Sequence, residues 1–245
     1  MNTGDKRVLL EVVDVNTYRG PAHVLRGVSL TVGENEVVSL VGRNGAGRTT
    51  ILESITGLLP MRSGRIRFRG DDITGLPPHK RAKRGIGYAP ENSGIFPELT
   101  VAENLMISRW VSEKTARDAF AGVDAETRAL EVFPEVHHLM GRQGINLSGG
   151  QKKMVSIARA MALAPSLMIL DEAFEGLAPV VVKRFREAVM KIKSLGISLL
   201  IAESNLVSAA AIADRLYVID RGEIIFHGTS KGAMENQEVM RALRG

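Results

Sequence analysis

The stretch VGRNGAGRTT, residues 41–50, constrains the fold more than any other part of the sequence. It begins at the end of a short apolar run, Val37–Val41, which predicts a strand buried on both faces. It leads into TTILESITGLL, where apolar residues recur at helical spacing and Gly57 marks the end of the helix. A glycine loop between a strand and a helix directs backbone N–H groups at one point, beside the positive end of the helix. The stretch therefore predicts either an anion cradle or a tight turn that binds no ligand.

The loop departs at one position from the phosphate-binding pattern G-x-x-x-x-G-K-[ST]. Gly42, Gly47 and Thr49 satisfy the pattern, and Arg48 occupies the lysine position. Thr49 is placed to bind Mg²⁺ through its hydroxyl. Arginine keeps the positive charge of lysine, but it is longer, planar and forked. Taken alone, the loop favours phosphate binding and a simple turn about equally.

A second motif, LMILDE, ends in two carboxylates. Its apolar residues predict a buried strand that delivers Asp171 and Glu172 to the carboxyl edge of a sheet, where ligands bind in α/β folds. One acid at such an edge can hold Mg²⁺, and another can deprotonate or orient a water molecule. The alternative is a strand followed by a solvated acidic loop.

The third motif is LSGGQ, residues 147–151. Ser148 and Gln151 have the spacing of a capping box, which predicts a helix start. Two glycines in the first turn cost roughly 1 kcal/mol each relative to alanine. Glycine is useful there if the backbone must come close to an anion, so the cap and an anion site are compatible.

Strands alternate with helices along most of the chain, which predicts an α/β fold with a parallel, helix-covered sheet. The expected strands of the last third are SLMIL, ISLLIA and LYVID, and the expected helices span 179–196, with Pro179 in the first turn and Gly196 at the end, and 206–215. In the first third, RIRFR predicts a half-exposed antiparallel strand. Near the end of the chain, Arg221–Gly222 predicts a hairpin turn. Residues 95–160 are expected to be helical, with a break at Pro134, and to be inserted into the α/β core.

Composition narrows the class of protein. The 245 residues contain no cysteine, which excludes disulfides and thiolate metal sites. No apolar run approaches the roughly 20 residues that span a bilayer, and the first residues do not resemble a signal peptide, so a soluble, cytosolic chain is expected. The net charge of +5 is mild, and the basic stretches have little aromatic interleaving, so nucleic-acid binding is not expected.

The order of the three motifs resembles that of the ATP-binding subunits of ABC transporters. GRNGAGRTT is similar to their Walker A loop, LSGGQ to their signature and LMILDE to their Walker B strand. The resemblance covers essentially the whole chain. It implies a P-loop NTPase fold with a parallel-sheet core, an N-terminal antiparallel β subdomain and an inserted helical subdomain. The expected bounds are about 1–92 and 158–245 for the core with the β subdomain, and about 93–157 for the helical subdomain.

The resemblance also implies a role for individual residues. Tyr18 would stack on adenine, Glu91 would sense the γ-phosphate or the metal, Glu172 would be the general base, and Thr49, Asp171 and Glu91 would bind Mg²⁺. The expected nucleotide-binding residues are Tyr18, Gly42, Arg43, Asn44, Gly45, Ala46, Gly47, Arg48, Thr49, Thr50, Glu91, Ser148, Gly149, Gly150 and Gln151. The expected catalytic residues are Glu172, Arg48 and Ser204.

Two positions depart from the family pattern near the terminal phosphate. Arg48 replaces the Walker A lysine, and Ser204 stands where the family has a histidine that bridges the γ-phosphate and the catalytic glutamate. Two hypotheses follow. In one, the chain is a working ATPase that tolerates both changes. In the other, it is a catalytically degenerate subunit that donates its LSGGQ motif to a competent partner site.

The resemblance extends to a subfamily. GYAPENSGIFPELTVAENL and EGLAP are similar to stretches of the ATP-binding subunits of branched-chain amino-acid importers, and urea and amide importers share the pattern. ATP and Mg²⁺ are the implied ligands. The implied partners are transmembrane permease subunits and a second ATP-binding subunit, identical or homologous, at the cytoplasmic face of the cell membrane. A soluble ABC protein that acts on DNA or ribosomes is the third and weakest alternative.

Overall fold

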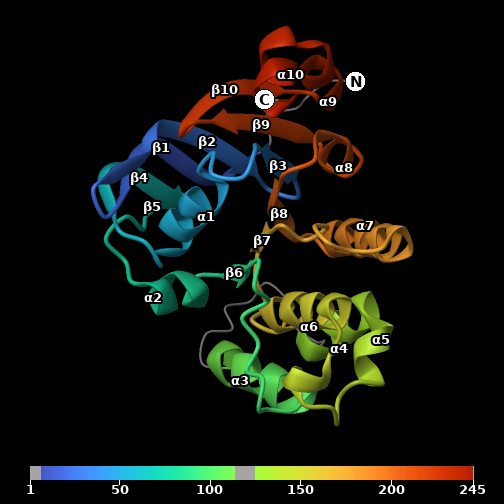
Figure 1. Cartoon of the computed structure of the whole chain (residues 1–245). Helices are drawn as coiled ribbons and strands as arrows, with labels where there is room; N and C mark the ends of the chain where they lie inside the picture. Colours follow the sequence, from blue (N-terminus) through green and yellow to red (C-terminus); the bar gives the residue numbers. More distant parts are fainter. Residues whose placement is uncertain (1–6, 114–124, 245) are drawn as a thin grey trace.

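The computed structural model describes residues 7–113 and 125–244, and Figure 1 labels its elements. No helix in these two ranges combines the length and the apolar composition that crossing a membrane requires.

A six-stranded sheet forms the centre of the molecule, in the order β10-β9-β3-β8-β7-β6. Its strands are β3 (Val37–Val41), β6 (Ile86–Ala89), β7 (Leu167–Asp171), β8 (Ser198–Glu203), β9 (Arg215–Asp220) and β10 (Glu223–Gly228). All neighbours pair in parallel except β9 and β10, which form an antiparallel hairpin through Arg221–Gly222 as predicted. Every residue of β3, β7 and β8 is buried, which agrees with their uninterrupted apolar sequences.

A four-stranded antiparallel sheet has the order β2-β1-β4-β5. Its strands are β1 (Val8–Arg19), β2 (Ala22–Gly33), β4 (Met61–Phe68) and β5 (Asp71–Asp72). Ile66 and Phe68 are buried while Arg65 is exposed, so the predicted half-exposed strand is confirmed.

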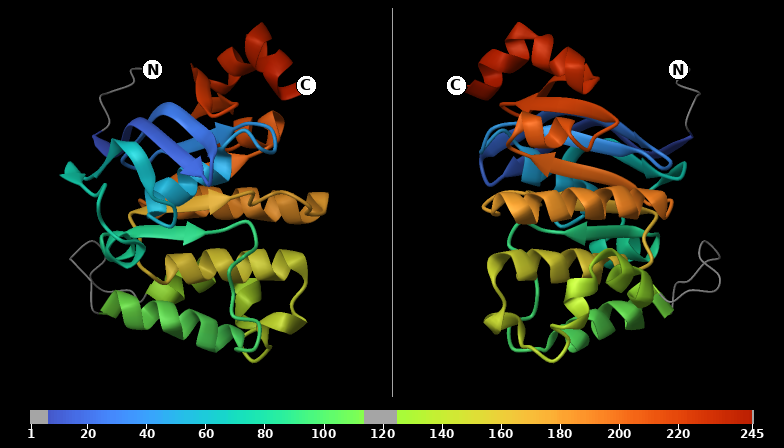
Figure 2. Two further views of the ribbon diagram at one scale, coloured as in Figure 1. Left: turned by 60° about the vertical axis from the view of Figure 1, so that its left-hand side comes forward. Right: turned by 90° about the vertical axis from the view of Figure 1, so that its right-hand side faces the viewer.

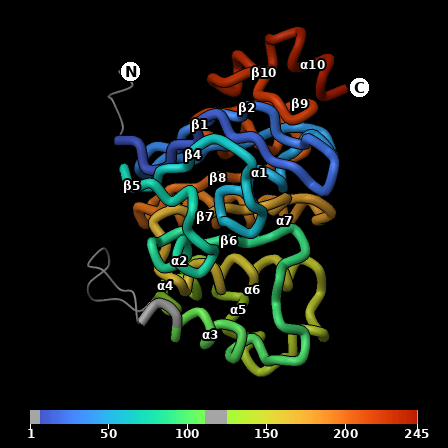
Figure 3. Tube along the Cα trace, turned by 90° about the vertical axis from the view of Figure 1, so that its left-hand side faces the viewer, coloured from blue at the N-terminus to red at the C-terminus, as the bar shows by residue number. Residues whose placement is uncertain are grey.

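The helices lie on both sides of the six-stranded sheet (Figures 1 and 2). They are α1 (Arg48–Thr56), α2 (Pro78–Lys83), α3 (Val101–Glu113), α4 (Ala125–Val132), α5 (Pro134–His137), α6 (Gly149–Met161), α7 (Pro179–Ser194), α8 (Leu206–Ala210), α9 (Ser230–Glu235) and α10 (Gln237–Arg244). Helices α3 to α6 form a layer at one end of the molecule, α1 lies beside the antiparallel sheet, and α9 and α10 lie at the opposite end beyond β10 (Figure 3). The expected subdomain boundary near residue 157 falls inside α6, which continues to Met161.

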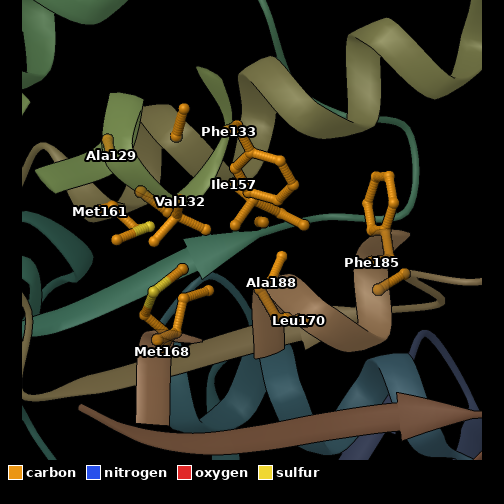
Figure 4. Packing of buried hydrophobic residues seen from close by; sticks show 14 of the residues in the cluster. Ala129, Val132, Phe133, Ile157, Met161, Met168, Leu170, Phe185 and Ala188 are labelled. Atoms are coloured by element: carbon orange, nitrogen blue, oxygen red, sulfur yellow. The ribbon is translucent and has the colours of Figure 1, made fainter. Parts of the chain in front are cut away.

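The six-stranded sheet separates two hydrophobic cores. Along β7, Leu167 and Ile169 face the core shared with α1 and the antiparallel sheet, whereas Met168 and Leu170 face the helical layer. In Figure 4 the side chains of Phe133 and Ile157, from the helical layer, point toward Phe185 and Ala188 of α7 and toward Leu170. The helical layer therefore packs on the sheet and α7 through a continuous apolar contact.

The predicted helix over 206–215 is wrong at its C-terminal end. Helix α8 stops at Ala210, and β9 already begins at Arg215. The guanidinium of Arg215 makes an ion pair with Glu36, and its backbone pairs opposite Val38 of β3. These long-range contacts hold Arg215 in the strand, so residues 211–214 form the turn between α8 and β9 and the helical periodicity is overridden there.

Candidate functional site

The glycine loop joins β3 to α1 in a conformation that side chains would obstruct. A Cβ on Gly42 would lie 2.5 Å from the carbonyl oxygen of Ile219. Gly47 has φ of 112° and is the N-cap of α1, so it adopts a backbone conformation that other residues avoid. No side chain caps α1, and its first turn contains no acidic residue. Several backbone N–H groups at this helix end therefore lack the usual acceptor, which suits an anion.

Arg48, the first residue of α1, has a buried side chain that is only 5% exposed. Its Nη2 donates hydrogen bonds to Oδ1 of Asn44 at 2.7 Å and to Oε1 of Glu172 at 2.5 Å. Its Nη1 is also buried and has no hydrogen-bond partner. A buried donor without an acceptor is unfavourable, so Arg48 presents one unsatisfied donor nitrogen next to the helix N-terminus.

Asp171 ends β7 at the carboxyl edge of the sheet, as the sequence predicted. Both of its carboxylate oxygens are buried and lack hydrogen-bond partners. Burial raises the pKa of Asp171 to about 6, while the side chain of Thr49 acts in the opposite direction and the charge of Glu172 in the same direction. A buried carboxylate with two free oxygens is a suitable ligand for a hard divalent cation such as Mg²⁺. Among the described residues, no three side chains of His, Cys, Asp or Glu gather as a metal site.

Glu172 is held in an unusual backbone conformation directly after Asp171. Its φ is 49°, in the left-handed region, and its N–H donates to the carbonyl oxygen of Ala202 at 3.0 Å. Lys153 of α6 donates to the carbonyl oxygen of Glu172. Such left-handed residues cost free energy and concentrate at functional sites. The backbone thus fixes the position of the carboxylate that contacts Arg48.

A third carboxylate, Glu203, lies at the same edge and was missed in the sequence analysis. It ends β8, is 1% exposed, and accepts a hydrogen bond from the N–H of Phe174 at 3.2 Å. Burial raises its pKa to about 7. The feature that identified Asp171, an acid at the end of a buried apolar strand, also applies to Glu203.

The buried guanidinium of Arg81 in α2 fixes the far end of α1. It donates four hydrogen bonds of 2.7 to 2.8 Å to the carbonyl oxygens of Leu76, Ser54, Ile55 and Thr74. Two of these carbonyls, of Ser54 and Ile55, belong to the last turn of α1, where carbonyl oxygens lack the donor partners of the regular helical pattern. Arg81 therefore anchors the helix that carries Arg48, and no sequence signal pointed to it.

Four other predicted residues have no described contact with Arg48, Asp171 or Glu172. Tyr18 stacks on His23 with ring centroids 4.4 Å apart, so one ring face is covered and the other remains for a base. Glu91 is exposed in the loop after β6, and Ser204 is half-buried just after β8. The hydroxyl of Thr50 accepts a hydrogen bond from Nε of Arg19 at 3.1 Å.

The LSGGQ motif begins α6 with the predicted capping box. The N–H of Gln151 donates to Oγ of Ser148, and the N–H of Ser148 donates to Oε1 of Gln151 at 2.9 Å. A Cβ on Gly149 would meet no atom within 4 Å, and one on Gly150 would make ordinary contacts. Packing within the chain therefore does not require either glycine. The motif lies in the helical layer and the glycine loop on the other side of the sheet, so the two are separate in one chain (Figure 1).

The described geometry combines an anion site with a cation site. The uncapped end of α1 and the free Nη1 of Arg48 suit phosphate, the free oxygens of Asp171 suit a divalent cation, and Glu172 supplies a fixed carboxylate beside both. Together they suit a metal-bound polyphosphate and a reaction that needs a positioned base.

Known proteins are similar to this chain in both sequence and fold. The sequence profile of the ABC transporter family matches residues 25–175. The chain is 38% identical to the lipopolysaccharide export system ATP-binding protein LptB of Escherichia coli, over 93% of each chain. It is 33% identical to the high-affinity branched-chain amino acid transport ATP-binding protein BraG of Pseudomonas aeruginosa, over 97% of this chain and 100% of the relative.

Among solved structures, the ADP conformation of an ATP-binding cassette of an ABC transporter superposes with a TM-score of 0.83 and 29% identity. The match covers 98% of this chain and 100% of that chain. The glycine loop, the carboxylate edge and these similarities agree, and the predicted α/β fold with a parallel core and an antiparallel β subdomain is confirmed. The chain therefore belongs to the ABC transporter family, as one of its ATP-binding subunits, and is a P-loop ATPase.

Proposed function

We propose that the chain binds MgATP at its own glycine loop and hydrolyses it to drive uptake of branched-chain or related amino acids. The observation that carries the ATP assignment is the pair of unsatisfied buried groups, Nη1 of Arg48 and the carboxylate of Asp171. Nη1 of Arg48 needs a hydrogen-bond acceptor and the carboxylate of Asp171 suits a cation, and a metal–triphosphate complex supplies both in adjacent positions.

Residue roles follow from the geometry. The backbone of 42–49 would hold the phosphates, and Thr49, Asp171 and Glu91 would bind Mg²⁺ directly or through water. Mg²⁺, when bound, would neutralise charge on the phosphate oxygens. Glu172 would orient and deprotonate the attacking water, because its backbone is fixed and its carboxylate is buried at the edge. Tyr18 would stack on adenine with the face that His23 leaves free.

The signature would act on a second subunit. Its two glycines have no packing role in this chain and begin a helix whose N-terminus is exposed, which suits contact with the phosphates of a partner's nucleotide. A dimer would then have two sites, each with the loop of one subunit and the LSGGQ of the other. Closure would move the helical subdomain, proposed as about 93–157, and a transmembrane permease attached at the cytoplasmic membrane face.

Similarity to the family's ATP-binding subunits gives no support to a degenerate subunit that only donates LSGGQ. Binding and hydrolysis at the chain's own site separate the two hypotheses. Calorimetry should detect MgATP binding in the micromolar to low millimolar range, and Asp171→Asn should weaken it. Glu172→Gln should retain binding and lose hydrolysis. Loss of transport with Ser148→Arg but not with Glu172→Gln would instead identify a subunit that serves only its partner's site.

The substrate assignment rests on the stretches 87–105 and 175–179 and on relatives such as BraG, which aligns over nearly the full length of both chains. LptB is somewhat more identical, so lipopolysaccharide export is the competing assignment. Uptake of labelled leucine should fall in cells that carry Glu172→Gln in place of the normal chain. Unchanged leucine uptake together with accumulation of lipopolysaccharide at the inner membrane would replace the importer assignment with the exporter.

A further inference from the structure

The two departures from the family pattern lie at one edge of the sheet. In the parallel pairing of β7 with β8, Asp171 is opposite Ala202, so Glu172 and Ser204 both follow the ends of neighbouring strands. Arg48 reaches the same edge from α1 and contacts Glu172. Both departures therefore lie at the edge that carries Glu172, and of the two only Arg48 has a described contact with its carboxylate.

The guanidinium of Arg48 has two terminal nitrogens with different surroundings. Nη2 is engaged by Asn44 and Glu172, and Nη1 is buried with no partner. A guanidinium presents its donors in a rigid fork, so one side can stay on Glu172 while the other binds a second acceptor. A lysine ammonium has one nitrogen, which would have to be shared between the two acceptors.

We propose that Arg48 is a positioning residue that bridges Glu172 and the terminal phosphate of the bound nucleoside triphosphate. Nη2 keeps the carboxylate in place, and Nη1 donates to a phosphate oxygen. The bridge replaces a contact that Ser204 is too short to make and that serine cannot support with a positive charge. This inference rests on the proposed ATP binding at the chain's own loop.

Burial supports a bridge that persists when nucleotide binds. The side chains of Arg48 and Glu172 are 5% and 8% exposed, so separating them would leave two buried charges uncompensated. Asn44 holds Nη2 from the other side at 2.7 Å and fixes the plane of the guanidinium. Phosphate binding through Nη1 requires neither contact to break, and it satisfies the remaining buried donor.

The test uses four full-length chains: wild type, Arg48→Lys, Ser204→His and the double variant. Each is measured for MgATP affinity by calorimetry and for maximal turnover at saturating MgATP. Arg48→Lys should bind MgATP within about threefold of wild type, because its ammonium keeps a point charge at the phosphates. Its turnover should fall by about tenfold or more, because Glu172 loses its fixed partner. Arg62→Lys, on the exposed surface of β4, is the matched control and should leave both quantities unchanged.

The double variant decides between bridging and a merely structural role. Histidine at position 204 should raise turnover by at least about fivefold more in the Arg48→Lys chain than in the wild-type chain, because there it supplies the missing bridge. Equal effects of histidine in both chains would overturn the bridge. Turnover of Arg48→Lys equal to or above that of wild type would also overturn it and identify the Arg48–Glu172 contact as inhibitory. If wild type binds no MgATP while Arg48→Lys binds it, the proposed ATP binding fails first, and the bridge fails with it.

Discussion

Gly222 gives the sharpest test of how the fold supports the nucleotide loop. It lies in the β9–β10 turn with φ of 85°, and a Cβ there would lie 1.9 Å from the carbonyl oxygen of Val24. Its N–H donates to Ala46 in the glycine loop, and its carbonyl accepts from Arg26, both at 2.9 Å. One residue thus connects the turn to the loop and to β2.

We expect Gly222→Ala to lower the free energy of unfolding by about 3 kcal/mol. About 1 kcal/mol comes from the left-handed backbone conformation. The rest comes from the two backbone hydrogen bonds, each worth about 1 kcal/mol, because a Cβ only 1.9 Å from a backbone oxygen forces the turn away from β2 and the loop. Gly20→Ala is the matched control, since Gly20 has φ of 57° but no atom within 4 Å of its Cβ position, and it should cost only about 1 kcal/mol.

Urea unfolding of the two variants and wild type measures this difference directly. Gly222→Ala should also weaken MgATP binding, because Ala46 loses the donor that holds its carbonyl. A loss of stability no greater than that of Gly20→Ala would show that the turn yields to the added methyl group. The reasoning from backbone overlap would then be refuted.

Three further predictions follow from buried charged groups. Arg81→Met should lower the free energy of unfolding by about 3 to 5 kcal/mol in urea titrations, because four carbonyls lose their donors. Arg81→Lys should lower it less. A loss below about 1 kcal/mol for Arg81→Met would contradict this reasoning. Glu203 has a folded-state pKa raised to about 7, so the folded chain binds its proton more tightly than the unfolded chain and loses stability as pH rises from about 4.5 to 7. Glu203→Gln should therefore stabilise the chain by about 2 kcal/mol at pH 8 and by little below pH 5, and thermal unfolding across this range checks the sign. Asp171→Asn should remove most of the dependence of ATP affinity on Mg²⁺; an unchanged difference between titrations with Mg²⁺ and with EDTA would place the metal ligand elsewhere.

Local patterns in the sequence predicted the elements of this fold well. The apolar runs of β3, β7 and β8 are buried throughout, Pro134 begins α5 just after α4 ends, and Ser148 forms its capping box. Each of these features depends on residues a few positions apart, so the sequence alone is informative. The exception, Arg215, shows the limit, because a distant ion pair and strand pairing override its local preference.

The candidate site was predicted as a set of positions but not as a set of contacts. The pair formed by Arg48 and Glu172 joins residues 124 positions apart, and its existence depends on the order of strands in the sheet. Arg81 satisfies carbonyls from two other segments, and an arginine in a basic stretch carries no local sign of burial. Sequence motifs identify which residues converge, whereas the buried ion pairs between them require the three-dimensional arrangement.

The strand order also means that β3 is synthesised long before the strands with which it pairs. Strand β3 pairs with β8 and β9, its only neighbours in the six-stranded sheet, and the register places Val37 opposite Leu199. Roughly 160 residues separate these partners. At ordinary rates of translation, β8 is therefore synthesised roughly 10 to 30 seconds after β3. During that interval the apolar VVSLV segment has unpaired edges, which favours association with other chains. The antiparallel hairpin of β1 and β2 joins adjacent residues, so we expect it to form much earlier, and its buried face belongs to the same core as β3 and α1.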